Sequence, residues 1–315
     1  MNRREFVTYS VGACVACATT KISAVLAEDA SSAPVAPRIY RCATPPPTPS
    51  DQIQANRVRS ALRAYRVNFN RTTVIPVHFH VIHEGQRGNL SDARLKSQVK
   101  LLNKVYAPAL VEFKIGDVTR HEDEHWFRVE PGSPVNAAMK AQLGKDTEHS
   151  LNVYTCEPPG LLGYATFPWE LAERPDIDGV VLHHASLPGA SEPWVEQPWP
   201  YDLGMTAAHE IGHWCGLYHT FQGGCVAPGD EIEDTAYEAE AASGCPIDQP
   251  SSCPGEQRFN PVENYMDYSF DECMKVFSRQ QVGRIKDMVG YYRYQLNPQT
   301  ARSTRLQQVR EAVGI

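Results

Sequence analysis

The stretch TAAHEIGHWCGLYH, residues 206–219, decides the fold and the chemistry of this chain. His209 and His213 are four residues apart, so on a helix both imidazoles project from one face and can share a metal ion. On a continued helix His219 would lie about 15 Å along the axis from His209, too far to bind the same ion. Glycine adopts a left-handed turn without strain, so we expect Gly216 to end the helix and His219 to swing back as a third ligand.

The chemistry of three histidines and a glutamate points to hydrolysis. Neutral imidazoles would leave a zinc ion with its full charge and an open position for water, whose pKa falls to about 7. Glu210 can accept the proton of that water and pass it to a leaving amine. The pattern therefore predicts zinc-assisted cleavage of peptide bonds.

A second H-E-x-x-H, at residues 121–125, provides an internal control. Its intervening residues are both charged, and Arg128 and Pro131 stand where the glycine and the third histidine would be. With 11 histidines in 315 residues, the five fixed positions of the longer motif should match by chance in about one such chain in 10⁴. We expect no site at residues 121–125.

The long motif, with NYMDY downstream, resembles the metzincin zinc peptidases, in which a methionine turn lies beneath the metal. Further segments are similar to the pappalysin family, particularly its single-domain extracellular branch: LGYATFP at 162–168, DGVV at 178–181, residues 213–225 and Cys273. The resemblance covers residues 41–293. It implies an α/β (α+β) fold, with a twisted mixed sheet and active-site helix in an upper lobe and an irregular, disulfide-bonded lower lobe.

Matched position by position, the resemblance implies roles for six residues. These are His209, His213 and His219 as zinc ligands, Glu210 as the catalytic base, Met266 as the turn methionine and Tyr268 as a donor to the transition-state oxyanion. Independently of the family, a phenol beside a zinc site suits a neutral donor for developing negative charge; the alternative is a packed aromatic. Tyr164–Phe167 matches the family's rim strand for extended substrates, with an ordinary core strand as the alternative.

Hydrophobic periodicity predicts the other elements. Strands are expected at 72–82, 111–118, 151–155 and 179–183, and helices after a Ser91–Asp92 cap, around His209 and at 280–294. This order favours an α/β lobe followed by a loop-rich lobe.

The N-terminal residues have the three parts of an export signal. Arg3-Arg4 and the weakly apolar run that follows are typical of a twin-arginine signal; a plain secretory signal and a lipoprotein signal cut before Cys14 remain alternatives. All three place the protein outside the cytoplasm, secreted or periplasmic. We expect a signal at 1–27, a leader at 28–71, a catalytic domain at 72–296 and a tail at 297–315.

Seven cysteines remain after Cys14 and Cys17 are removed with the signal, and disulfides are expected in an exported chain. The four in the lower lobe allow three pairings, of which the resemblance favours Cys225–Cys253 and Cys245–Cys273. Two hypotheses compete for Cys42 and Cys156. RCATP at 41–45 resembles the cysteine switch of metzincin zymogens, in which a thiolate fills the open zinc position; the alternative is a Cys42–Cys156 disulfide.

Two further sites are predicted in the lower lobe. Asp230, Asp234 and Thr235 offer oxygen ligands for calcium, with a solvated acidic loop as the alternative. Glu272, together with Asp271, follows the methionine turn and could favour Lys or Arg after the cut; the alternative is a solvated surface pair.

Composition limits the partners. The chain has 37 acidic against 30 basic residues and a net charge of −7, so it offers no basic field for nucleic acid. No apolar run of about 18 residues follows the N-terminus, so no membrane span is expected in the mature form. We expect a monomer that acts on proteins or peptides. A zinc-stapled binding protein is the main alternative, but it would need no base at Glu210.

Overall fold

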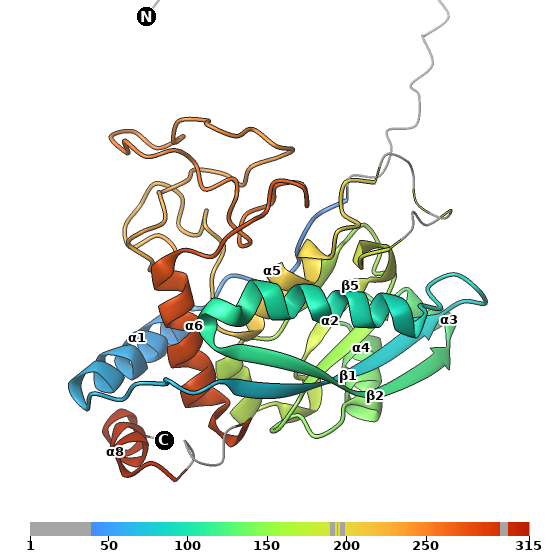
Figure 1. Cartoon of the computed structure of the whole chain (residues 1–315), viewed down its shortest axis with the longest axis horizontal. Helices are drawn as coiled ribbons and strands as arrows, with labels where there is room; N and C mark the ends of the chain where they lie inside the picture. The colour runs from blue at the N-terminus through green and yellow to red at the C-terminus, as the bar shows by residue number, and fades with distance from the viewer. Residues whose placement is uncertain (1–38, 190–192, 194, 196–198, 297–301, 315) are drawn as a thin grey trace, which may run out of the picture. The chain divides into compact units, whose positions relative to one another are not determined.

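The centre of the molecule is a five-stranded sheet in the order β2-β1-β3-β5-β4 (Figure 1). This computed structural model describes residues 39–189, 193, 195, 199–296 and 302–314, so the predicted signal lies outside the described residues. The strands are β1 (Thr73–His83), β2 (Val111–Glu122), β3 (Leu151–Cys156), β4 (Gly163–Ala165) and β5 (Val180–His183). β2, β1, β3 and β5 run in parallel, and β4 pairs antiparallel to β5 at one edge. The predicted mixed sheet is confirmed.

Helices cover both faces of this sheet. They are α1 (Pro49–Ala64), α2 (Asp92–Tyr106), α3 (Glu124–Phe127), α4 (Pro134–Leu143), α5 (Met205–Trp214), α6 (Arg279–Tyr292) and α8 (Thr304–Val313). Short 3-10 turns are η1 (Ala107–Ala109), η2 (Pro168–Ala172), η3 (Pro175–Ile177), η4 (His184–Ser186) and η5 (Tyr294–Leu296). Alternate β1 residues, such as Val77 and Phe79, point into one core with α2 and α5. Ile82 and residues of α3 and α4 form a second core on the other face.

The lower lobe is formed by residues 219–278, which contain no helix or strand of the described set. In Figure 1 it is the group of orange loops beyond α6. Two disulfides, Cys225–Cys253 and Cys245–Cys273, cross-link it, which confirms the predicted pairing. Cross-links of this kind reduce the conformational freedom of the unfolded chain and so stabilise a lobe with little regular structure.

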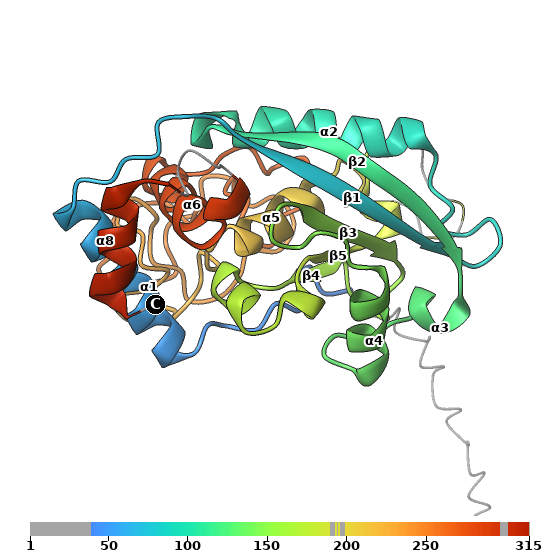
Figure 2. The same ribbon diagram turned by 90° about the horizontal axis from the view of Figure 1, so that it is seen from below.

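Four helices were not predicted, which are α3, α4, α1 and α8. α1 lies in the expected leader, where Thr48 and Asp51 form a capping box that starts a helix directly after the proline run. α8 lies in the expected C-terminal tail, and α1, α6 and α8 pack together at one end of the molecule (Figure 2). No helix among the described residues is long and apolar enough to cross a membrane.

Candidate active site

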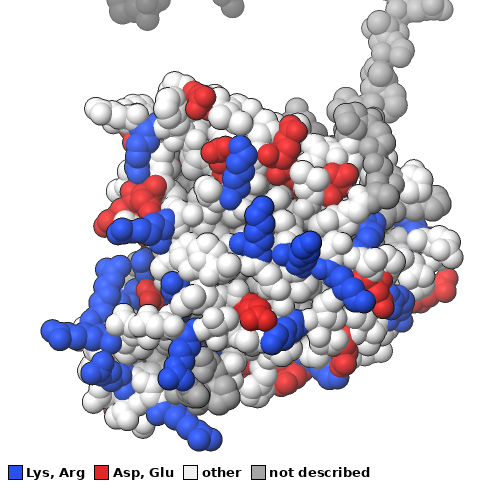
Figure 3. All heavy atoms as spheres, viewed as in Figure 1, with Lys and Arg blue, Asp and Glu red and all other residues white. Residues whose placement is uncertain are grey.

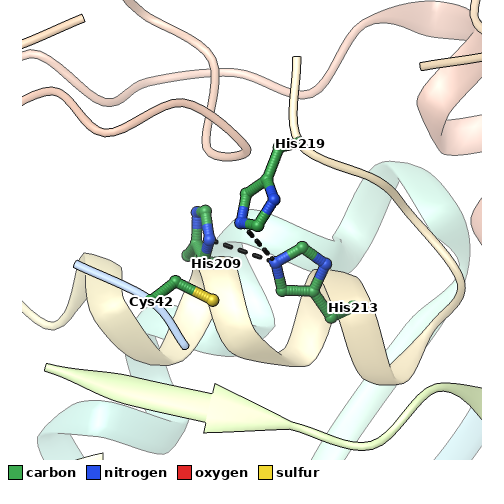
Figure 4. A group of neighbouring side chains, drawn as sticks. All are labelled: Cys42, His209, His213 and His219. Atoms are coloured by element: carbon green, nitrogen blue, oxygen red, sulfur yellow. Dashed lines mark hydrogen bonds between the residues drawn. The ribbon is translucent and has the colours of Figure 1, made fainter. Parts of the chain in front are cut away.

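Helix α5 presents the first two histidines toward one point (Figure 4). His209 Nδ1 lies 2.8 Å from the Tyr265 carbonyl oxygen, and His213 Nδ1 lies 2.8 Å from the Leu217 carbonyl oxygen. A carbonyl can only accept, so each Nδ1 is the protonated nitrogen and each Nε2 carries a free lone pair. These two backbone contacts fix both rings with their lone pairs pointing out of the helix.

A turn after α5 brings His219 back toward the other two rings. Gly216 has φ of 90°, the left-handed conformation expected of it, and α5 ends two residues earlier at Trp214. His213 Nε2 then lies 3.2 Å from His209 Nε2 and 3.0 Å from His219 Nε2. Burial lowers the pKa of all three rings, to about 4 for His213, so neutral acceptors face one another. Such a donor set fits a metal ion.

Glu210 is buried beside these rings. Its Oε2 accepts hydrogen bonds from Thr44 Oγ1 at 3.0 Å and from Cys42 Sγ at 3.3 Å, while Oε1 has no partner among the described residues. Burial raises the pKa of this carboxyl to about 8. Gly163 on β4 leaves room for it, because a Cβ there would lie 2.9 Å from Glu210 Cγ.

A tight turn at residues 264–268 lies beneath the rings. Asn264 Oδ1 accepts the Met266 amide at 2.9 Å, and Met266 Sδ fills the space beside Gly212, where any Cβ would clash with it. Tyr268 hydroxyl lies 3.3 Å from His219 Nε2 and donates to the Cys42 carbonyl oxygen at 3.2 Å. Burial raises the pKa of Tyr268, so its hydroxyl stays a neutral donor.

The leader passes through this site. Cys42 Sγ and one nitrogen of each of the three histidines lie within 4.8 Å of one another. Cys42 and Cys156 are both free thiols, which contradicts the alternative of a disulfide between them. The leader runs along the outer edge of β4, where Ala43 donates to the Gly163 carbonyl at 3.0 Å and Leu162 donates to the Tyr40 carbonyl at 2.9 Å. It therefore occupies the edge strand that the sequence suggested for substrate binding.

Next to Cys42, an arginine of the leader enters a buried pocket. Arg41 guanidinium contacts Asp271 Oδ1 at 2.6 and 3.1 Å, and it lies over the ring of Tyr201, 5.3 Å from the centroid. The other Asp271 oxygen accepts the amides of Leu203 and Met205 at the start of α5. Asp271, and not its exposed neighbour Glu272, thus forms the floor of this pocket.

A buried ion pair behind α5 was missed by sequence reasoning. Asp178 accepts the indole of Trp214 at 2.9 Å and both terminal nitrogens of Arg293, at 2.9 and 3.1 Å. Its Oδ1 also accepts from Thr166, just after β4. One carboxylate therefore connects the end of α5 to the residue after β4 and to the end of α6.

The other predicted residues do not assemble in this way. His121 lies on β2 and His125 on α3, so the second H-E-x-x-H does not form one helical face. Asp234 accepts Ser278 Oγ at 2.5 Å and the Gln280 amide at 3.0 Å, at the start of α6. Asp230 accepts Thr235 Oγ1 at 2.8 Å. Asp230 and Thr235 thus contact each other, whereas Asp234 binds donors at the start of α6.

A helix with two converging histidines and a buried glutamate, a third histidine brought back after a glycine and a methionine turn below define a metalloprotease of the metzincin type. Residues 195–290 match the peptidase M43 family described as pregnancy-associated plasma protein-A. An extracellular metalloprotease of Verticillium alfalfae is 36% identical over 272 residues, covering 82% of this chain and 92% of that protein. One from Pyricularia oryzae is 35% identical, over 81% of this chain and 90% of that protein.

Two solved structures are also similar to this chain. Mirolysin in complex with compound 9 is 30% identical, with a TM-score of 0.64, over 73% of this chain and 98% of that one. A promirolysin variant of Tannerella forsythia is 26% identical, with a TM-score of 0.65, over 81% of this chain and 95% of that one. The chain therefore belongs to the pappalysin family, peptidase M43, and is an extracellular metalloprotease.

Proposed function

We propose that the chain is a zinc endopeptidase in which His209, His213 and His219 hold the metal and Glu210 is the general base. The observation that carries this proposal is the convergence of three neutral Nε2 atoms, 3.0 and 3.2 Å apart, next to a buried carboxylate. Three nitrogen ligands and one open position are the donor set of catalytic zinc sites.

A zinc ion held here would supply a Lewis acid that polarises the substrate carbonyl and acidifies water. Glu210 takes a proton from the attacking water, since its Oε1 has no protein partner in the described chain. It then delivers that proton to the leaving amine. Tyr268 donates to the oxygen on which negative charge develops, as its hydroxyl does to the Cys42 carbonyl here.

The zinc assignment is tested by removing and restoring the metal. Dialysis of leader-free protein against a chelator should abolish cleavage of casein, and one equivalent of zinc should restore it. Cleavage that survives complete loss of metal would contradict the assignment.

Latency through Cys42 is the second part of the proposal. Its sulfur lies where an attacking water would need to be, among the ligand nitrogens, and it also accepts the Thr44 amide at 3.2 Å. Burial raises the pKa of the Cys42 thiol, and a bound zinc ion would oppose this by stabilising the thiolate. The promirolysin structure covers 81% of this chain against 74% for mature mirolysin with a cleaved peptide, which supports a leader ahead of the catalytic domain.

The leader also suggests the substrate preference. Arg41 fills the pocket over Asp271 one residue before Cys42, and its side chain is 1% exposed against 0% for that carboxylate. When the leader departs, the pocket would present a carboxylate to a basic substrate side chain. We infer a preference for Arg, then Lys, in the residue after the cut, with Asp271 taking the role that the sequence suggested for Glu272.

A panel of peptides that differ only in that residue tests the preference. The leader-free enzyme should cleave the Arg peptide at least about tenfold faster than the Leu peptide, because a buried charge pair replaces an unpaired carboxylate. Faster cleavage of the Leu peptide would contradict the inference.

Calcium at Asp230, Asp234 and Thr235 stays a prediction, as does the monomeric state. In favour of a cation near this loop, Asp230, Glu238 and Asp267 are buried carboxylates with raised pKa values. Against it, the contacts described above already use the carboxylates of Asp230 and Asp234.

A further inference from the structure

The leader is attached to the rest of the molecule at two separate places. One is formed by residues 41–44, with Arg41 on Asp271 and Cys42 among the histidines. The other is helix α1, which lies at the end of the molecule with α6 and α8 (Figure 2). Only residues 45–48, three of them prolines, lie between the two attachments.

The second attachment is apolar. Ala55, Val58 and Leu62, spaced as one face of α1, are at most 1% exposed. They pack on what we call the α6–α8 surface, formed by Met288, Tyr291, Leu306 and Val309. α8 makes its main contacts with α1. The C-terminal helix therefore serves chiefly to cover the leader helix.

The chain after α1 also packs on the rest of the molecule, as far as Phe69. Phe69 packs directly on the Cα of Gly290 in α6, where any side chain would clash with its ring. Within α1 itself, Asn56 donates to Glu231 Oε1 at 2.8 Å. Asn70, Arg71 and Thr72 are exposed and lie in coil, so a protease can reach them. A cut there would leave α1 and Phe69 on the leader side.

We propose that the α6–α8 surface is an exosite for the leader helix, which keeps the leader bound after the chain is cut at residues 70–72. The proposal rests on the latency proposed above. A bound α1 would hold Cys42 near the metal site at a millimolar effective concentration, on the order expected for a short linker. The three prolines stiffen that linker. A cut in the coil alone therefore leaves the enzyme latent, and activation requires that α1 dissociate or that residues 45–48 be cut.

The charges around this surface indicate that apolar packing, and not charge attraction, binds the leader helix. Basic side chains gather over the end of the molecule where α1 and α8 lie (Figure 3). They include exposed Arg57 and Arg63 on the leader and Arg302 and Arg305 beside or on α8. Arg59 of α1 also lies 3.9 Å from Asp287 of α6, which is one attractive pair against several repulsive ones. High salt screens both kinds of charge interaction and strengthens apolar contact. Release of the leader should slow in high salt.

The experiment uses the exported, zinc-loaded chain with a recognition sequence for a site-specific protease inserted between Asn70 and Arg71. After complete cutting, two quantities are followed: co-elution of the leader fragment in gel filtration, and peptide hydrolysis over time. Val309→Asp places a carboxylate in the exosite. Gln308→Asp places the same carboxylate on the exposed face of α8 and is the matched control.

We expect the cut parent and Gln308→Asp to retain the leader and stay latent, with slower release in 1 M salt (~7 times physiological ionic strength). Val309→Asp should release the leader at least about tenfold faster and gain activity at the same rate. The co-elution readout needs no hydrolysis, so it separates failure of the exosite from failure of the latency proposed for Cys42. Equal release from all three cut chains would overturn the exosite.

A second pair of variants tests whether Val309→Asp acts only by misfolding α8. Val58→Asp and its control Ser60→Asp lie on α1 itself, which leaves with the leader, so the remaining chain is identical in both. Faster release from the Val58 variant alone supports the exosite. Retention as firm as in the control would overturn it.

Discussion

Glu210 depends on its neighbours for its proposed role. Helix α5 buries the carboxylate completely, Gly163 leaves it space on the β4 side, and Oε1 has no partner among the described residues. Burial raises its pKa to about 8, and a zinc ion bound to the neighbouring histidines would oppose this rise. The same residue in the second H-E-x-x-H, Glu122, lies at the end of a strand.

Tyr268 gives the sharpest prediction for a single side chain other than Glu210. Tyr268→Phe should lower kcat by about 10²-fold, because one donor to the developing oxyanion is lost. KM and zinc content should change little, since the phenol is not one of the three ring ligands. Steady-state kinetics with a fluorogenic peptide and metal analysis measure these quantities.

The matched control is Tyr265→Phe, on the same turn. Tyr265 hydroxyl donates to the Lys275 carbonyl at 2.7 Å and does not contact the histidines. Equal losses of kcat in the two variants would show that Tyr268 acts only through packing.

Several buried acidic side chains lie close together in the lower lobe. Glu238 is fully buried, with Asp267 and Asp230 near it, and burial together with the Asp267 charge raises its pKa to about 8. A carboxyl whose pKa is higher in the folded than in the unfolded state stabilises the fold fully below about pH 4.5. That contribution is lost progressively as pH rises toward about 8.

Glu238→Gln should therefore leave stability nearly unchanged at low pH and raise it at high pH. Between about pH 5 and pH 9 we expect the gain to grow to roughly 2–4 kcal/mol, or several degrees in Tm. Thermal unfolding across that range measures the gain. Glu240→Gln, two residues away and exposed, should show no such trend; a flat difference for Glu238→Gln would contradict the prediction.

Local pattern explains which elements could be predicted from the sequence. β1 and α2 follow from alternation and from the Ser91 cap, and the three histidines follow from their spacing around Gly216. The leader helix was not predicted because its proline-rich start indicates extended chain, although the Thr48–Asp51 capping box was present in the sequence.

Contacts between distant residues could not be predicted in this way. Arg41 and Asp271 are 230 positions apart, and Asp178 and Arg293 are 115 apart. No periodicity or local motif relates such residues, because only the folded chain brings them together. The RCATP segment drew attention to Cys42, but the pocket occupied by Arg41 became visible only in the structure.

At the scale of the whole molecule, the leader connects the two ends of the enzyme. It passes the three histidines, follows β4 and then packs as α1 against α6 and α8. The two disulfides hold the lower lobe that carries Asp271 and the methionine turn. The proposed latency, specificity and catalysis thus all involve residues between the sheet edge and this lobe.

The most direct test of the account compares the parent with Glu210→Gln after the leader has been removed from both. Zinc content and casein hydrolysis are measured on the same samples. We predict equal zinc in the two proteins and a loss of kcat/KM of about 10²–10⁴-fold in the variant, because the base is removed and the ligands are kept. A zinc-loaded parent that cuts nothing, or a variant as active as the parent, would contradict it.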